Sequence, residues 1–331
     1  MNFSIIIPVF DRPDELEELL QSIVDQGSAR VPEVVVVEDG SKLSSAKVVK
    51  KFEAVLNIKY LEKENSGPGL SRNFGMSRAR GDYFIIIDSD CLLSDHYLDE
   101  VAQGLEVRYT DAFGGPDAAH PSFTLIQKAI SYAMTSFLST GGLRNSESQE
   151  KKFQLRSFNM GISKESFIKT RGFAAQRFGE DIEFTNRLWS AGLTTQFLPK
   201  ALVYHKRRTS WYKFFMQVYN FGAARPVLGA MYPKMKGLTY WFPSLFIILF
   251  IIAVLILVFG YHLPILLFLL YFALVFLDAS LKGKGVMQGM ASVFAVFIQF
   301  FGYGLGFLTS VIKLRILGKS TKETFPEMFI N

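Results

Sequence analysis

Short apolar runs alternate with helix-like periodicity over the first ninety residues. The runs are "FSIIIPVF", "EVVVVED", "IKYLE" and "DYFIII", and they lack the polar alternation of a strand with one solvated face. Apolar residues after the first run, from Leu16 to Ile23, recur at helical spacing, and a second helical stretch lies near residues 44–54. Continuous apolar strands that each lead into a helix are typical of a parallel sheet covered on both faces. The pattern predicts an α/β domain with a Rossmann-like, mostly parallel sheet and helices on both faces.

The C-terminal part of the chain shows a different pattern. Residues 241–277 and 286–312 contain no Asp, Glu, Lys or Arg. Because about 20 apolar residues cross a bilayer, the first stretch predicts two transmembrane helices joined at "GYHLP" (260–264), and the second predicts a third. A set of buried core helices is the alternative. Three crossings would leave the basic residues at 313–322 outside, against the positive-inside rule. We therefore expect a re-entrant last segment or a break at "QFFGYGLG" (299–306).

Charge divides the chain. Residues 1–183 carry 21 Lys or Arg against 27 Asp or Glu, whereas residues 184–331 carry 15 against 3. The basic residues from Lys206 to Lys236 precede the first apolar segment, which fits the cytoplasmic side of a membrane and contact with anionic headgroups. Nucleic acid is disfavoured as a partner because the preceding half is acidic.

The single cysteine, Cys91, allows no internal disulfide, and no N-terminal signal is visible. We expect a multi-pass protein of the cytoplasmic membrane with its catalytic domain in the cytoplasm.

Acidic residues follow three of the predicted strands: Asp11, Asp39, and the pair Asp88 and Asp90. Carboxyl ends of parallel strands converge on one crevice, where ligands bind. Several carboxylates in one crevice need a compensating positive charge, and Mg²⁺ or Mn²⁺ beside ligand phosphates would supply it. A solvated turn that caps the next helix is the alternative for the D-x-D pair.

Two further motifs could carry chemistry. "ENSGPGLSRNFG" is a glycine-rich entry to a helix that bears Arg72, an arrangement suited to a diphosphate. "RFGEDIEF" places Glu180 and Asp181 at the start of an amphipathic helix, where one carboxylate could act as a general base. Ordinary helix N-terminal acids are the alternative.

Together, "SIIIPVFDR", "VVVVEDGS", "NSGPGLSRNFGMSRARGDYFIIIDSD", "FNMGISKESFIKTRGF" and "RFGEDIEFTNRLWSAG" resemble glycosyltransferase family 2, the inverting nucleotide-sugar enzymes of the GT-A fold. The resemblance covers about residues 2–225. It implies that Asp181 is the catalytic base, supported by Glu180, and that Asp90 and Asp88 hold the metal. The residues it implies for nucleotide-sugar binding are Pro8, Val9, Asp11, Asp39, Arg72, Asp88, Ser89 and Asp90.

Other segments match the family less specifically. "GGPD" (114–117) and "NMG" (159–161) resemble segments that flank the donor sugar and the acceptor, which implicates Gly115, Asp117, Asn159, Met160 and Gly161. His205 lies where some relatives place a histidine near the metal; contact with phospholipid or a backbone carbonyl is the alternative. The Q-x-x-R-W motif of processive synthases is absent, since the nearest stretch is "QVYNFGAAR". The resemblance therefore implies a non-processive enzyme.

The sequence thus predicts a metal-dependent inverting transfer of one sugar from a nucleotide-diphosphate sugar to an acceptor hydroxyl. The donor we expect is a UDP-sugar, with GDP- or dTDP-sugars as alternatives. The acceptor we expect is a lipid-linked saccharide used in cell-envelope glycan synthesis. A catalytically silent membrane scaffold and a nucleotidyltransferase are the competing functions. The expected parts are a GT-A domain (1–225), a basic juxtamembrane segment (226–240), transmembrane helices (241–317) and a C-terminal tail (318–331).

Overall fold

The computed structural model describes residues 1–27, 32–141 and 152–329. The chain forms two compact units. The sheet unit is built mainly from Met1–Ala118 and Asn145–His205, and the helical unit from Ala119–Arg144 and Lys206–Phe329. The predicted domain boundary at residue 225 stays a prediction.

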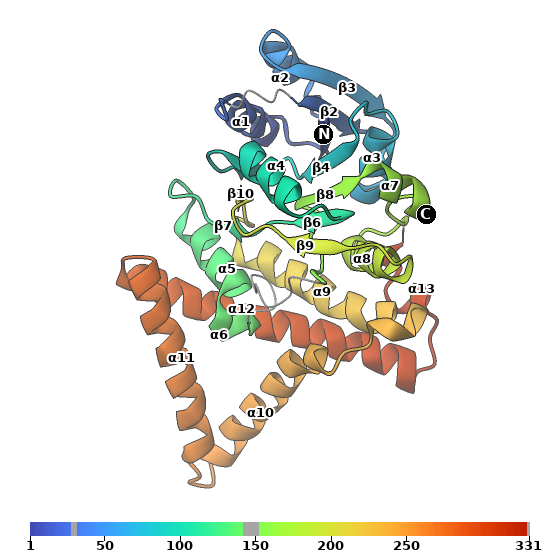
Figure 1. The fold of residues 1–331 in the computed structure, drawn as a ribbon. Coiled ribbons are helices and arrows are strands. Elements are labelled where there is room, and N and C mark those ends of the chain that lie inside the picture. The colour runs from blue at the N-terminus through green and yellow to red at the C-terminus, as the bar shows by residue number, and fades with distance from the viewer. Residues whose placement is uncertain (28–31, 142–151, 330–331) are drawn as a thin grey trace. The chain divides into compact units, whose positions relative to one another are not determined.

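The sheet unit contains a seven-stranded sheet in the order β3-β2-β1-β4-β8-β6-β9 (Figure 1). The pairs β3–β2, β2–β1, β1–β4 and β6–β9 are parallel, whereas β8 is antiparallel to both of its neighbours. The predicted mostly parallel sheet is therefore confirmed. Its strands are β1 (Phe3–Val9), β2 (Glu33–Asp39), β3 (Asn57–Lys63), β4 (Tyr83–Ile87), β6 (Ala112–Gly114), β8 (Asn159–Ser163) and β9 (Thr195–Phe197).

Helices cover both faces of this sheet, which explains why its strands lack polar alternation. Ile5 and Ile7 of β1 join a core that includes buried residues of α1 and α4, whereas Ile6 joins a second core with Phe184 and Leu188 of α8. The helices of this unit are α1 (Pro13–Val24), α2 (Ala46–Phe52), α3 (Pro68–Met76), α4 (Tyr97–Val107), α7 (Lys164–Thr170) and α8 (Glu180–Ser190).

A second, three-stranded sheet has the order β5-β10-β7, with strands β5 (Cys91–Leu93), β7 (Asp117–Ala118) and β10 (Val203–His205). β10 is antiparallel to β5 and parallel to β7. This pairing sets His205 opposite Cys91, directly after the D-x-D pair. A residue more than a hundred positions downstream is thereby brought to the end of β4.

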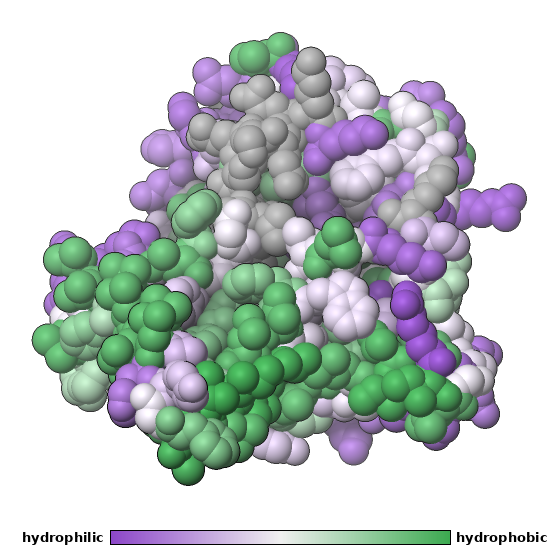
Figure 2. Space-filling model, turned by 90° about the horizontal axis from the view of Figure 1, so that it is seen from below, coloured by the Kyte–Doolittle hydropathy of each residue, from purple (hydrophilic) through white to green (hydrophobic). Residues whose placement is uncertain are grey.

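The helical unit contains long apolar helices. Its helices are α5 (Leu125–Thr135), α6 (Phe137–Thr140), α9 (Trp211–Met231), α10 (Phe242–Leu257), α11 (Leu263–Lys282), α12 (Val286–Val311) and α13 (Thr321–Thr324). Within the described residues, three helical segments are long and apolar enough to cross a membrane: Leu238–Leu257, Leu263–Lys282 and Val286–Ile316. Figure 2 shows the broad apolar surface that such helices present.

The structure confirms the predicted turn after α10, because α11 begins only at Leu263. The predicted break at residues 299–306 is wrong, since α12 is continuous through it. An added Cβ on Gly302 would clash with Val218, and one on Gly306 would clash with the carbonyl oxygen of Tyr219. The glycines let α12 approach α9 closely instead of ending the helix.

Candidate functional site

The D-x-D pair follows the buried strand β4 at its carboxyl end. Asp90 forms an ion pair with Arg12, which directly precedes α1, and its Oδ1 lies 3.3 Å from Nε2 of His205. Burial would raise the pKa of the Asp90 carboxyl, but the facing His205 and Arg12 bring that pKa below its usual range. Asp90 is therefore a carboxylate held between two nitrogen groups from distant parts of the chain.

Arg72 joins the D-x-D pair to the start of α8. Its guanidinium is buried, with the side chain 2% exposed, and it donates to Asp88 Oδ1 at 2.6 Å and to Glu180 Oε1 at 3.1 Å. Burial alone would lower the pKa of Arg72, but the charges of Asp88 and Glu180 outweigh it and raise that pKa above its ordinary value. One cation thus fixes two acids that lie far apart in the sequence.

The two acids at the start of α8 have different surroundings. Glu180 is buried and also accepts a hydrogen bond from Ser157 at 3.3 Å. Burial, together with the charge of Asp181, raises the pKa of Glu180 to about 7, although Arg72 opposes this shift. Asp181 is partly exposed, and its Oδ2 lies 3.9 Å from the guanidinium of Arg156. Of the pair, Asp181 is the acid with access to solvent.

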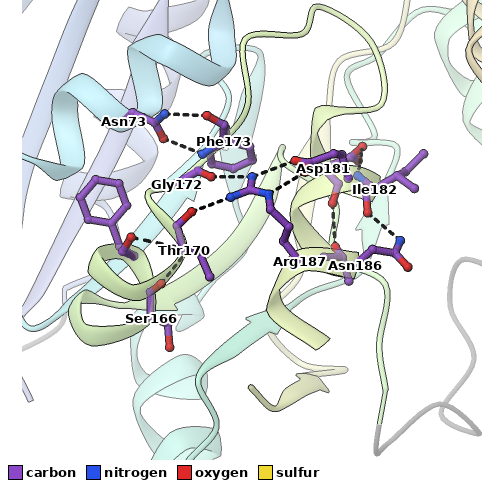
Figure 3. A network of polar contacts seen from close by, with 12 residues as sticks. Asn73, Ser166, Thr170, Gly172, Phe173, Asp181, Ile182, Asn186 and Arg187 are labelled. Atoms are coloured by element: carbon purple, nitrogen blue, oxygen red, sulfur yellow. Dashed lines mark hydrogen bonds and ion pairs between the residues drawn. The ribbon is translucent and has the colours of Figure 1, made fainter. Parts of the chain in front are cut away.

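A network of side-chain to backbone bonds fixes α8 against the rest of the sheet unit (Figure 3). Arg187 donates to the carbonyl oxygens of Thr170 at 2.6 Å and Gly172 at 2.7 Å, and it forms an ion pair with Glu183 at 2.6 Å. Asn73 of α3 makes two bonds of 2.8 Å to the backbone of Phe173. The helix that carries Glu180 and Asp181 is therefore tied to the helix that carries Arg72.

A group of metal-ligating side chains lies at the D-x-D end of β4. One possible ligand atom each from Asp90, Cys91 and His205 lies within 4.8 Å of the others. A carboxylate oxygen and a neutral imidazole nitrogen are both electron-pair donors, so the facing Asp90 and His205 fit a shared divalent cation such as Mn²⁺. Cys91 is buried in the core of the sheet unit.

The other two predicted strand-end acids contact backbone amides. Asp39 accepts from the N–H groups of Ser66 and Gly67 at 2.9 Å each and forms an ion pair with Lys63. Asp11 accepts from the backbone N–H groups of residues 42 and 43. Asp39 thereby fixes the loop that opens α3, and with it the position of Arg72. The predicted nucleotide-contacting roles of Pro8, Val9, Asp11, Asp39 and Ser89 stay predictions.

The predicted donor-sugar and acceptor segments lie where β6 leads into β7 and at the start of β8. The fully buried Asn159 accepts from the Tyr97 hydroxyl at 2.7 Å and donates to the carbonyls of Pro116 at 3.0 Å and Ala201 at 2.8 Å. An added Cβ on Gly115 would clash with the same Ala201 carbonyl. Two more of these residues are buried in the structure, namely Met160 and Asp117. An added Cβ on the remaining one, Gly161, would clash with the ring of Phe113. These residues support the site by packing, and their contact with sugar stays a prediction.

Sequence reasoning missed three basic residues at the site: Arg12, Lys63 and Arg156. Each pairs with an acid that was predicted, namely Asp90, Asp39 and Asp181 respectively. Arg12 directly follows Asp11 in "FDRP", so its place after a strand end was the available signal. Arg156 precedes "SFNMG" and carries no comparable signal.

The sequence of this chain was compared with known families and proteins. The sequence profile of glycosyl transferase family 2 matches residues 4–171, which is 168 of the 331 residues. Chondroitin synthase of Pasteurella multocida (strain Pm70) is 29% identical over 241 residues, covering 62% of this chain and 25% of that protein. Poly(ribitol-phosphate) beta-N-acetylglucosaminyltransferase TarS of Staphylococcus aureus (strain Mu50 / ATCC 700699) is 29% identical over 152 residues, covering 41% of this chain and 26% of TarS. The chain thus spans about a quarter of the length of these curated relatives.

Solved structures share the fold. The mannosyltransferase PcManGT from Pyrobaculum calidifontis, in complex with GDP-Man and Mn²⁺, has a TM-score of 0.61 at 18% identity, covering 91% of this chain and 87% of that one. S. aureus TarS 1-349 in complex with UDP-GlcNAc has a TM-score of 0.51 at 16% identity, covering 96% and 93%. The predicted GT-A fold is therefore confirmed. Since the family profile matches more than half of its residues, the chain belongs to glycosyl transferase family 2.

Proposed function

We propose that this protein is an inverting glycosyltransferase that moves one sugar from a nucleotide-diphosphate sugar to an acceptor hydroxyl. The observation that carries the proposal is Arg72, whose buried guanidinium joins Asp88 of the D-x-D pair to Glu180 beside Asp181. A donor-binding motif and a general base must lie close together for a direct displacement, and this cation holds their elements together. Membership of glycosyl transferase family 2 supports the same reaction class.

The proposed donor is a UDP-sugar. TarS was solved with UDP-GlcNAc, whereas PcManGT was solved with GDP-Man, so the fold itself accepts more than one base. A panel of UDP-, GDP- and dTDP-sugars, with detection of the released nucleotide, tests the choice. Release of nucleoside diphosphate fits a glycosyl transfer, whereas release of pyrophosphate would identify a nucleotidyltransferase.

The proposed metal ligands are Asp90 and His205, with Asp88 nearer to the donor. A bound Mn²⁺ or Mg²⁺ would stabilise the negative charge that develops on the leaving diphosphate. Chelation should abolish turnover, and added Mn²⁺ should restore it. His205→Ala should raise the Mn²⁺ concentration that is needed for half-maximal activity. Turnover that persists after complete chelation would exclude metal dependence.

The proposed base is Asp181, the solvent-accessible acid of the pair. It removes the proton from the acceptor hydroxyl as the oxygen attacks the anomeric carbon on the face opposite the diphosphate, so the configuration inverts. Glu180, buried and bound to Arg72, positions the start of α8. Substitution of a general base typically lowers the rate about 10²- to 10⁴-fold.

Two matched variants test the base assignment. Asp181→Asn should lose transfer activity while retaining its fold and its affinity for the donor nucleotide. Glu165→Gln alters an exposed acid in the first turn of α7 and should leave activity unchanged. Wild-type turnover by the Asp181 variant would overturn the assignment. Loss of activity in both variants would show that the assay responds to any acid removed from a helix start.

The proposed acceptor is a lipid-linked saccharide at a membrane surface. The described residues of the same chain include three segments long and apolar enough to span a membrane, and basic residues precede the first of them. Not all of those basic residues face outward, because Arg207 is buried and Arg225 lies over the ring of Tyr240 at 4.2 Å. Purified enzyme should glycosylate extracted polyprenyl-diphosphate saccharides. Transfer to soluble sugars or proteins alone would refute the lipid acceptor.

A further inference from the structure

The positions of the basic residues constrain how the helical unit meets a membrane. Lys and Arg residues precede α10, separate α11 from α12, and follow α12, whereas the α10–α11 turn (258–262) contains neither. Three full crossings would put the cluster that follows α12, namely Lys313, Arg315, Lys319 and Lys322, on the side opposite the other clusters. The positive-inside rule disfavours that arrangement.

The packing of α12 on α9 gives an independent constraint, because the two helices run side by side in the same direction. The Trp211 ring contacts that of Phe294 near the start of the contact, with ring centroids 5.1 Å apart. Farther along, an added Cβ on Gly306 would lie 3.0 Å from the backbone nitrogen of Ala223. As residue numbers rise along α9, the contacts on α12 therefore rise as well.

The parallel packing of α9 and α12 limits the paths that the chain can take through the membrane, because the α10–α11 hairpin lies between them in the sequence. α10 and α11 return the chain to the side from which it entered, whether they cross fully or dip into the bilayer. If α9 also crossed, α12 would have to cross in the direction opposite to α9. The observed parallel packing excludes that path. If α12 alone crossed, α9 would lie at bilayer depth with Lys213 and Arg225, and charged side chains at that depth carry a penalty of several kcal/mol.

The surface of α12 fits a helix that lies on the membrane instead of crossing it. Its outward residues Met287, Phe294 and Leu305 are exposed and apolar. Many of its other residues are buried, and several of these are small, namely Gly289, Ser292, Ala295, Gly302 and Gly306. By contrast, α10 and α11 expose large apolar side chains along most of their length. A helix whose exposed apolar residues are confined to one stripe can lie along a membrane surface with that stripe in the lipid, even though α12 lacks the charged face of a free interfacial helix.

We propose that α10 and α11 alone penetrate the bilayer, and that α9 and α12 lie side by side in the plane of its cytoplasmic interface. The α12 stripe then contacts lipid acyl chains near the headgroups, and every basic cluster lies on one side. Trp241, 40% exposed at the start of α10, sits where aromatic side chains anchor helices at the interface. The third apolar segment thus binds the membrane surface without spanning it.

Depth measurements on the full chain in phosphatidylethanolamine and phosphatidylglycerol vesicles test this proposal. Spin labels are placed at Met287→Cys and Leu305→Cys, which are five helical turns apart and point the same way. Oxygen and nickel-chelate accessibility should report equal depths within about 5 Å, whereas a spanning helix would separate them by about 27 Å. A separation above about 10 Å would overturn the proposal. The wild-type protein, whose Cys91 is buried, gives the labelling background.

The penetrating hairpin supplies a matched control. Labels at Leu245→Cys and Ile252→Cys on α10, both exposed, lie two turns apart and should differ in depth by about 10 Å. An independent test uses Lys319→Cys, an exposed position after α12, together with Lys284→Cys before it. In bacterial spheroplasts, a membrane-impermeant maleimide should label both only after lysis. Labelling of Lys319→Cys in intact spheroplasts would show that α12 crosses.

Discussion

Replacement of Arg187 by methionine tests whether α8 is held in place by the network in Figure 3. The substitution retains much of the side-chain volume but removes both bonds to the carbonyl oxygens of Thr170 and Gly172. It also removes the ion pair between Arg187 and Glu183, and so leaves an unpaired carboxylate on a side chain that is only 2% exposed. α8, which carries Glu180 and Asp181 at its start, would lose the tie that its last turn makes to the end of α7 and the residues after it.

The expected loss can be bounded from these contacts. Breaking a buried ion pair by removing one partner costs about 3–5 kcal/mol. Solvent screens part of this interaction because the Arg187 side chain is 33% exposed, so we take the lower end, about 3 kcal/mol. For a domain of about 150–250 residues this corresponds to a fall in Tm of roughly 6–12 °C.

Thermal unfolding in detergent, followed by tryptophan fluorescence, measures this loss, and Trp189 of α8 is a local reporter. Lys51→Met is the matched control. Both side chains of the Lys51–Glu17 ion pair are exposed, so the pair should contribute less than about 1 kcal/mol to the free energy of unfolding. Arg187→Met combined with Glu183→Gln should recover part of the loss, since the unpaired buried charge is then gone. A Tm for Arg187→Met no lower than that of Lys51→Met would refute the reasoning.

Two other predictions follow from the structure. The pKa of Glu180 is about 7 in the folded state against 4.5 ordinarily, so its protonated form adds stability that is fully present below about pH 4.5 and lost as the pH rises through 7. Glu180→Gln should flatten this part of the Tm–pH profile, and an unchanged profile would contradict the assignment. Gly222→Ala should lower the unfolding free energy of the helical unit by roughly 1–3 kcal/mol, and its Tm with it, because the added Cβ would clash with the Tyr303 carbonyl. In the control Gly285→Ala the added Cβ meets no atom within 4 Å, so the expected cost is smaller, up to about 1 kcal/mol for the poorer N-cap of α12.

The sequence identified the acids of the site but not the cations that hold them. Asp88, Asp90 and Asp181 each follow a recognisable signal, either a strand end or a helix start. Their partners Arg12 and Arg156 come from segments whose contacts depend on how the chain folds, as the 78-residue separation of Arg12 and Asp90 shows. A strand end places Arg12 near the site, but local patterns cannot report which acid it pairs with, because nothing in the neighbouring residues encodes that contact.

For the apolar C-terminal helices, too, the sequence predicted some features correctly and missed a feature that depends on packing. Composition was sufficient to locate them and the turn after α10, because a charge-free run has few alternatives to a buried or lipid-exposed helix. It led to the wrong prediction of a break in α12, since glycine weakens an isolated helix but permits close packing between two helices.

By itself, the sequence determined the α/β class, the strand-end acids and the apolar segments, because these depend on periodicity and composition within a few turns of chain. Only the tertiary structure decided that Arg72 joins Asp88 to Glu180, that His205 faces Asp90, and that α12 runs parallel to α9. Each of these is a contact between segments far apart in the chain, and such contacts are set by packing.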